Sequence, residues 1–139
     1  MGRPGNTDMA TETVIEVENV VTRFGPPEVL QFRNVPSPTL GSGQVRVRVR
    51  MIGLNFADVM ARLGVYPGIP DPPFIPGIEF AGSVTEVAPG VRSIRRGDRV
   101  MGFSRQGAYA EEVCVPAGFV RRIPQSMTCL LYTSPSPRD

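Results

Sequence analysis

Several amino acids that support common kinds of function are missing from this chain. None of its 139 residues is histidine, lysine or tryptophan. Without histidine, the segment has no histidine metal ligand and no histidine general base. It has two cysteines, Cys114 and Cys129, and Cys129 belongs to a terminal stretch that we set aside below. One remaining cysteine excludes a disulfide framework and fits a reducing compartment.

Long apolar runs and strongly one-sided charge are also absent. No apolar run approaches the roughly 20 residues that span a bilayer, and residues 1–6 contain no hydrophobic signal core. We therefore predict a cytoplasmic protein with no integral membrane segment. The formal net charge is +2, and the arginines are dispersed without interleaved aromatic residues. This pattern argues against nucleic acid as a partner.

The two ends of the chain differ in composition from the middle. Residues 1–12 are polar and contain glycine, so we interpret them as a flexible leader. Residues 129–139 resemble a translated transposase sequencing adapter, and we predict that they are a non-native tail. The residues between these ends, 13–128, are enough for one domain with a hydrophobic core.

The middle of the chain has the pattern of a mainly β domain. Its clearest strand alternates Val45, Val47 and Val49 with three arginines, so one face should be buried and the arginine face solvated. Turn signals such as Pro89-Gly90 separate the apolar runs. Many short strands with regular turns predict a partly closed barrel or a sandwich. We expect strands over residues 13–24, 29–35, 45–50, 78–87, 99–103, 107–115 and 119–123.

One short helix is predicted over residues 55–63. Asn55 is a suitable N-cap, and Asp58 falls at the third helical position, where a carboxylate favours the positive end of a helix. An apolar series follows helical spacing and is expected to pack inward: Phe56, Val59, Met60 and Leu63. Residues 64–76 are rich in glycine and proline and should form a loop around Tyr66.

Four blocks of residues carry a resemblance to a known family. They run from Gly53 to Asp58, from Gly64 to Gly68, from Pro76 to Gly82 and from Gly97 to Gly102. Together they resemble the substrate-side domain of the medium-chain dehydrogenase/reductases, in the branch without zinc, over about residues 14–128. The resemblance implies a GroES-like, partly closed β-barrel with one short helix. It also implies that a Rossmann domain, carrying the dinucleotide phosphate loop, completes the enzyme.

The resemblance lets the zinc positions be checked one by one. Zinc-dependent relatives place a cysteine after the glycine that is Gly53 here, and a histidine before the glutamate that is Glu79. This chain has Leu54 and Ile78 at those places, and neither side chain offers a lone pair to a metal. We therefore predict no zinc and no other metal ligand. The buried-strand setting of Cys114 favours a thiol that is inert.

By resemblance, the full-length protein would pass a hydride from NADPH to a quinone or an α,β-unsaturated carbonyl. Asn55 would bind near the cofactor ribose or the substrate carbonyl, and helix capping alone is the alternative. Tyr66 and Asp58 are the catalytic candidates. The alternatives are a loop aromatic packed on the barrel for Tyr66 and a helix-end carboxylate for Asp58. Met60 stands where many quinone reductases have a second tyrosine, which argues against a tyrosine pair.

Other functions remain open at this stage. One alternative is an enoyl-thioester reductase domain of a polyketide or fatty-acid synthase. Another is a non-catalytic, vesicle-associated homologue. A co-chaperonin would need a long mobile loop, and the early turn at residues 25–28 is short and proline-rich. The family resemblance further implies a homodimer when the protein is full length, and a fragment that is inactive alone.

Overall fold

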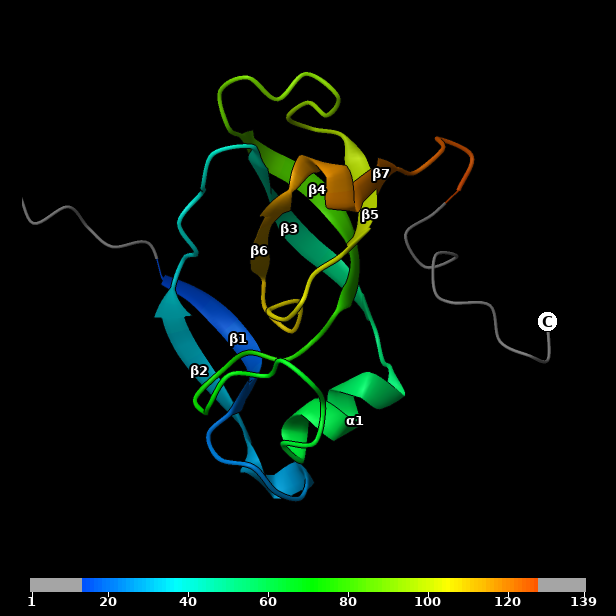
Figure 1. The fold of residues 1–139 in the computed structure, drawn as a ribbon. Helices are drawn as coiled ribbons and strands as arrows, with labels where there is room; N and C mark the ends of the chain where they lie inside the picture. Colours follow the sequence, from blue (N-terminus) through cyan, green and yellow to red (C-terminus); the bar gives the residue numbers. More distant parts are fainter. Residues whose placement is uncertain (1–13, 128–139) are drawn as a thin grey trace, which may run out of the picture.

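The computed structural model describes residues 14–127, which fold into one helix and seven strands (Figure 1). The expected leader, 1–12, and the expected tail, 129–139, lie outside this range. No helix within it is long and apolar enough to cross a membrane. The elements are β1 (Val14–Val21), η1 (Pro27–Val29), β2 (Leu30–Pro36), β3 (Gln44–Gly53), α1 (Phe56–Arg62), β4 (Glu79–Val87), β5 (Arg99–Phe103), β6 (Glu112–Pro116), η2 (Ala117–Phe119) and β7 (Val120–Arg122).

The strands form two sheets. β1 and β2, which correspond to the strands expected over residues 13–24 and 29–35, pair as an antiparallel hairpin. The other five strands form a curved antiparallel sheet in the order β6-β3-β4-β5-β7. Among residues 14–127 the two edge strands of this sheet do not pair with each other, so the sheet is not closed into a barrel. The mainly β, GroES-like fold with one short helix is confirmed.

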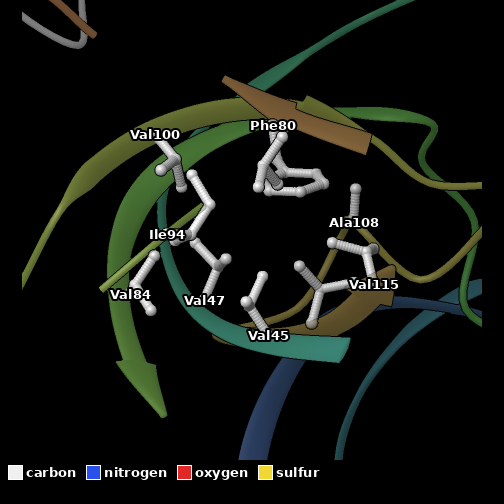
Figure 2. Close-up of a cluster of buried hydrophobic side chains, with 10 residues drawn as sticks. Val45, Val47, Phe80, Val84, Ile94, Val100, Ala108 and Val115 are labelled. Carbon is white, nitrogen blue, oxygen red and sulfur yellow. The ribbon is translucent and has the colours of Figure 1, made fainter. Parts of the chain in front are cut away.

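The curved sheet wraps around a core made largely of valines (Figure 2). Val45 and Val47 are fully buried in β3, and Phe80 and Val84 face them from β4. The period of two in β3 therefore identifies the buried face correctly. The wrapped interior is also lined by Ile94, Val100, Ala108, Val113, Val115 and Val120.

The arginine face of β3 is only partly solvated as predicted. Arg48 is exposed, but Arg46 is half-buried between two carboxylates. Its guanidinium lies 3.0 Å from Glu86 and 3.3 Å from Glu112, which are carried by the neighbouring strands β4 and β6. A guanidinium can satisfy several acceptors at once, so Arg46 bridges three strands where the sequence indicated a solvated side chain.

The β1–β2 hairpin and α1 lie together at one end of the molecule (Figure 1). Their shared cluster contains Val21 and Val29 from the hairpin region and Ala61 from the helix. The backbone N–H of Gly25 donates to the carbonyl of Arg62 at 3.1 Å, and the Arg62 guanidinium donates to the carbonyl of Gly25. The helix is therefore fixed at its C-terminal end by the turn before β2.

The predicted inward face of the helix is wrong. Phe56 is 77% exposed, Val59 and Leu63 are also exposed, and Met60 is half-buried. The buried residues of the helix are Asp58 and Ala61. Helical spacing identifies an apolar stripe, but it cannot say which side of a helix the rest of the chain covers. Here the covered side carries Asp58 and the small Ala61, and the large apolar side chains lie on the other sides.

The strand predicted from residue 107 begins later, at Glu112. Residues 107–109 instead bond to the loop before β4: Gly107 donates to the carbonyl of Ile75 at 2.8 Å, and Tyr109 donates to that of Pro76 at 3.0 Å. These bonds satisfy the backbone without a strand ladder. They hold Tyr109 over Gly77, whose absent side chain leaves room for the ring.

Candidate functional site

The candidate site is centred on the N-terminus of α1, where β3 ends. Asn55 is extended there, with φ −121° and ψ 152°, and serves as the N-cap residue. Asp58 is the third helical residue, as predicted, and its Oδ2 accepts the backbone N–H of Asn55 at 2.9 Å. This bond is the carboxylate half of a capping box. It fixes the backbone of Asn55 relative to the first turn of the helix.

A tyrosine from a distant part of the sequence completes the surroundings of Asp58. The hydroxyl of Tyr109 donates to Asp58 Oδ2 at 2.9 Å. Asp58 is 8% exposed, and its second oxygen, Oδ1, is buried without a hydrogen-bond partner among the described residues. Burial and the contact with Asp58 raise the pKa of Tyr109 above its ordinary value, so the phenol stays protonated and remains a donor.

The Asn55 side chain turns toward β4. Its Nδ2 donates to Glu79 Oε2 at 3.1 Å, and Glu79 is itself 6% exposed. Gly53 makes this approach possible, because a Cβ at Gly53 would lie 2.3 Å from Glu79 Oε2. Glu79 is thus a hydrogen-bonded acid at the start of β4. It holds the Asn55 amide in one orientation and leaves the second N–H of that amide available.

A cavity of about 380 Å³ is lined in part by Glu79. Its wall also includes Met101, Phe103 and Phe119, and both phenylalanines are exposed. An apolar wall with a few polar groups is the usual character of a small-molecule site. The cavity is therefore suited to a small, mostly apolar ligand next to the acid that orients Asn55.

The structure brings two of the three predicted site residues together. Asn55 and Asp58 share a hydrogen bond, whereas Tyr66 lies in the loop after α1 and is 38% exposed. Tyr66 is not a member of the hydrogen-bonded cluster formed by Asn55, Asp58, Glu79 and Tyr109. Its catalytic role stays a prediction.

The two positions of the zinc ligands carry hydrocarbon side chains. Leu54 is exposed, and Ile78 is half-buried. Within residues 14–127, no three potential ligand side chains of the His, Cys, Asp or Glu type gather in one place. The absence of zinc stays a prediction that rests on the chemistry of these side chains.

Cys114 does not belong to the site. Its thiol is half-buried on β6 and lies 3.7 Å from the carbonyl oxygen of Pro38. Burial raises the pKa of Cys114, which disfavours the reactive thiolate at neutral pH. The geometry therefore agrees with a thiol that is not a nucleophile.

Tyr109 is the member of the cluster that sequence reasoning misses. It was expected within a strand, where its side-chain direction would follow simple alternation. The contact with Asp58 spans 51 positions in the sequence, so no local pattern could indicate it. The glycine at position 77, with φ +99° and room for a ring, is a signal only once the fold is known.

The fold and the site define a class of protein. The family model of the alcohol dehydrogenase GroES-like domain matches residues 41–125, which are most of the described residues. The chain belongs to this family, and its structural neighbours are quinone oxidoreductases of the medium-chain dehydrogenase/reductase superfamily.

Two individual relatives show how similar the chain is to known proteins and how much of them it covers. The chain is 44% identical to the synaptic vesicle membrane protein VAT-1 homolog of Rattus norvegicus over 111 residues, which are 78% of this chain and 28% of the relative. It is also 44% identical to the pikromycin polyketide synthase component PikAII of Streptomyces venezuelae over 112 residues, 81% of this chain and 3% of the relative. The chain thus spans less than a third of the length of either relative.

Solved structures agree with these relatives. The human synaptic vesicle membrane protein VAT-1 homolog-like protein matches with a TM-score of 0.81 and 35% identity, over 84% of this chain and 38% of that one. The Escherichia coli quinone oxidoreductase complexed with NADPH matches with a TM-score of 0.76 and 31% identity, over 84% and 35%. The chain is therefore similar to one domain of larger oxidoreductases.

Proposed function

We propose that this chain is the substrate-side domain of a zinc-independent, NADPH-dependent oxidoreductase that reduces quinones or α,β-unsaturated carbonyls. The observation that carries the proposal is the anchored amide of Asn55. Glu79 accepts one of its N–H groups at 3.1 Å, and Asp58 holds its backbone at 2.9 Å. A neutral amide fixed in this way can bind a ribose hydroxyl or a carbonyl oxygen without adding charge.

The described residues fit one end of the cofactor. Asn55 and the apolar cavity beside Glu79 suit a nicotinamide and a flat acceptor. The diphosphate would need a glycine-rich loop that opens a helix, whereas Gly41-Ser42-Gly43 leads into β3. We therefore assign the phosphate contacts to a further domain. When bound, NADPH supplies the hydride.

The chain's own residues would position the acceptor and polarise its oxygen. The free N–H of the Asn55 amide would donate to an oxygen on which negative charge develops. Phe103 and Phe119 would exclude water from the acceptor. Tyr66, on the exposed loop beyond α1, is the proposed proton donor, and Asp58 the proposed support of Asn55.

Two measurements test this function. Sequencing the locus through and beyond the codon for Thr128 should reveal a frame that continues into a glycine-rich nucleotide-binding domain. The full-length protein should then oxidise NADPH, followed by absorbance, when it is given a panel of quinones and enones. Lack of turnover with every acceptor would contradict the proposal and favour a non-catalytic, vesicle-associated role, which the likeness to the VAT-1 homologs supports.

A second candidate reaction has its own support. The 44% identity to PikAII favours an enoyl-thioester reductase, which delivers hydride to the β-carbon of an unsaturated thioester. Adding a short enoyl thioester to the acceptor panel separates the two reactions by their relative kcat/KM. We further propose a cytoplasmic homodimer with no zinc. Size-exclusion chromatography with light scattering, followed by elemental analysis, tests the dimer and the metal content.

A further inference from the structure

Tyr109 is the described residue that connects the candidate site to the rest of the fold through a side-chain hydroxyl. The bond from its oxygen to Asp58 Oδ2 is 2.9 Å long and buried. The same oxygen, Oδ2, accepts the N–H of Asn55. One carboxylate oxygen therefore receives a donor from the loop before β6 and a donor from the N-cap of α1.

The position of Tyr109 is determined on two sides. Its backbone N–H donates to Pro76 at 3.0 Å, and the neighbouring Ala108 donates to Gly77 at 3.1 Å. The ring lies against Gly77, where a Cβ would come within 2.3 Å of Tyr109 Cδ1. The phenol is thus aimed at Asp58 by the backbone pairing and by the space that Gly77 leaves.

Removing this phenol would leave a poorly satisfied carboxylate in the interior. Asp58 Oδ1 already lacks a partner among the described residues, and Oδ2 would retain only the Asn55 N–H. A buried carboxylate with so few donors rotates or takes up water to recover hydrogen bonds. Each of these responses would move the N-cap residue, because Asp58 and Asn55 share a bond.

We propose that Tyr109 is a positioning residue: through Asp58 it fixes the Asn55 amide against Glu79, so that the amide meets the acceptor in one orientation. This proposal rests on the proposed function for its effect on turnover. Its structural part, the order of Asn55, does not depend on turnover. The two parts are therefore tested separately.

The structural part is tested on the 139-residue chain by amide hydrogen exchange. Tyr109→Phe removes one oxygen and keeps the ring over Gly77. Exchange at the Asn55 N–H should accelerate about tenfold, which is the effect of losing one hydrogen bond to a charged group. Ser104→Ala is the matched control, since it removes a hydroxyl from the same loop, and that hydroxyl bonds to the backbone carbonyl and N–H of Gln106 and not to the site. Exchange at Asn55 that is the same in both variants would overturn the proposal.

The kinetic part is tested on the full-length enzyme. Tyr109→Phe should lower kcat about tenfold with the KM for NADPH within about twofold, because the phosphate contacts lie in another domain. Asp58→Asn should lower kcat similarly, and the double variant should be no worse than the poorer single one. Additive losses, or a change in KM alone, would contradict a positioning role.

Two further outcomes are assigned in advance. If the wild-type enzyme does not turn over, the proposed function fails, and the exchange experiment alone decides whether Tyr109 orders Asn55. If Tyr109→Phe unfolds at the assay temperature, Asp58→Asn replaces it in the exchange experiment. Unchanged Asn55 exchange in a folded Asp58→Asn variant would overturn the proposal.

Discussion

The curved sheet buries most of its large apolar side chains, whereas the helix α1 leaves most of its own exposed. In β3, Val45 and Val47 are fully buried and Arg48 is exposed. At α1, Phe56 is exposed and Asp58 is buried. Burying apolar groups stabilises a fold, whereas burying a carboxylate costs free energy unless it is well bonded. The sheet therefore contributes stability, and the start of α1 has the arrangement expected of a site.

The largest difference in stability between the two regions is expected for two phenylalanine substitutions. Phe80→Ala should lower the free energy of unfolding by about 3–5 kcal/mol, because its ring is almost fully buried in the sheet core. Phe56→Ala should change it by no more than about 0.5 kcal/mol, since the side chain is exposed. Urea denaturation of the 139-residue chain measures both. Comparable losses for the two variants would contradict the assignment of Phe80 to the core and of Phe56 to the surface.

Two glycines of similar backbone conformation test how tightly the loop next to the site is packed. Gly77→Ala should destabilise by at least about 2 kcal/mol, since it combines left-handed strain with a clash against the Tyr109 ring. Gly90→Ala has a similar φ, +87° against +99°, and open space around its Cβ. It should cost about 1 kcal/mol from backbone strain alone. Equal thermal shifts for the two variants would show that the ring yields easily.

The alkaline limb of the stability profile reports on Tyr109. Burial, together with Asp58, raises its pKa in the folded protein, whereas unfolded tyrosine ionises near pH 10. The protonated phenol therefore contributes fully below about pH 10, and the contribution is lost as the pH rises further. Tyr109→Phe should flatten this loss in denaturation curves between about pH 8 and pH 11.

Cys114 supplies the control for that profile. Burial also raises the pKa of its thiol, so its contribution is lost from a lower pH, near the unfolded thiol value of about 8.5. Cys114→Ser should change the profile below pH 10 and leave the steeper part above it. A wild-type slope above pH 10 that Tyr109→Phe leaves untouched would show that the phenol is not buried against Asp58.

The smallest effect on stability is expected for Asp98, which lies just before β5. A hydrogen bond from the Arg95 backbone, followed by Arg122, lowers the pKa of Asp98. Its contribution is therefore present above about pH 4 and is lost as the pH falls. Asp98→Asn should cost about 1 kcal/mol or less at pH 7, because the pair with Arg122 is partly exposed. A loss as large as that of Phe80→Ala would contradict the comparison of the two regions.

The sequence predicts most of the sheet and the local part of the site, but not the long-range contacts of the site. Alternation of Val45 and Val47 identifies the buried face, because a strand has only two faces to choose between. The same reasoning fails for Phe56, since a short helix at the edge of the molecule need not cover its apolar stripe. It also fails for Arg46, whose acceptors on β4 and β6 are adjacent only in the folded sheet.

The site residues also divide into those with local contacts, which could be predicted, and those with long-range contacts, which could not. Asn55 and Asp58 are three positions apart and follow the local rules for a helix start, so they could be predicted together. Tyr109 reaches Asp58 through long-range pairing between two loops. Glu79 reaches Asn55 because Gly53 has no side chain. Neither contact has a periodic signature in the sequence.

The central claim is that the anchored Asn55 amide serves turnover and not merely the cap of α1. Asn55→Ala in the full-length enzyme should lower kcat for the best acceptor about 100-fold, while the free energy of unfolding falls by about 1–2 kcal/mol. Asn34→Ala removes the same amide from an exposed position on β2 and should leave both quantities unchanged. An Asn55→Ala enzyme that retains the wild-type kcat, despite the loss of stability, would reduce Asn55 to a helix cap and contradict the account.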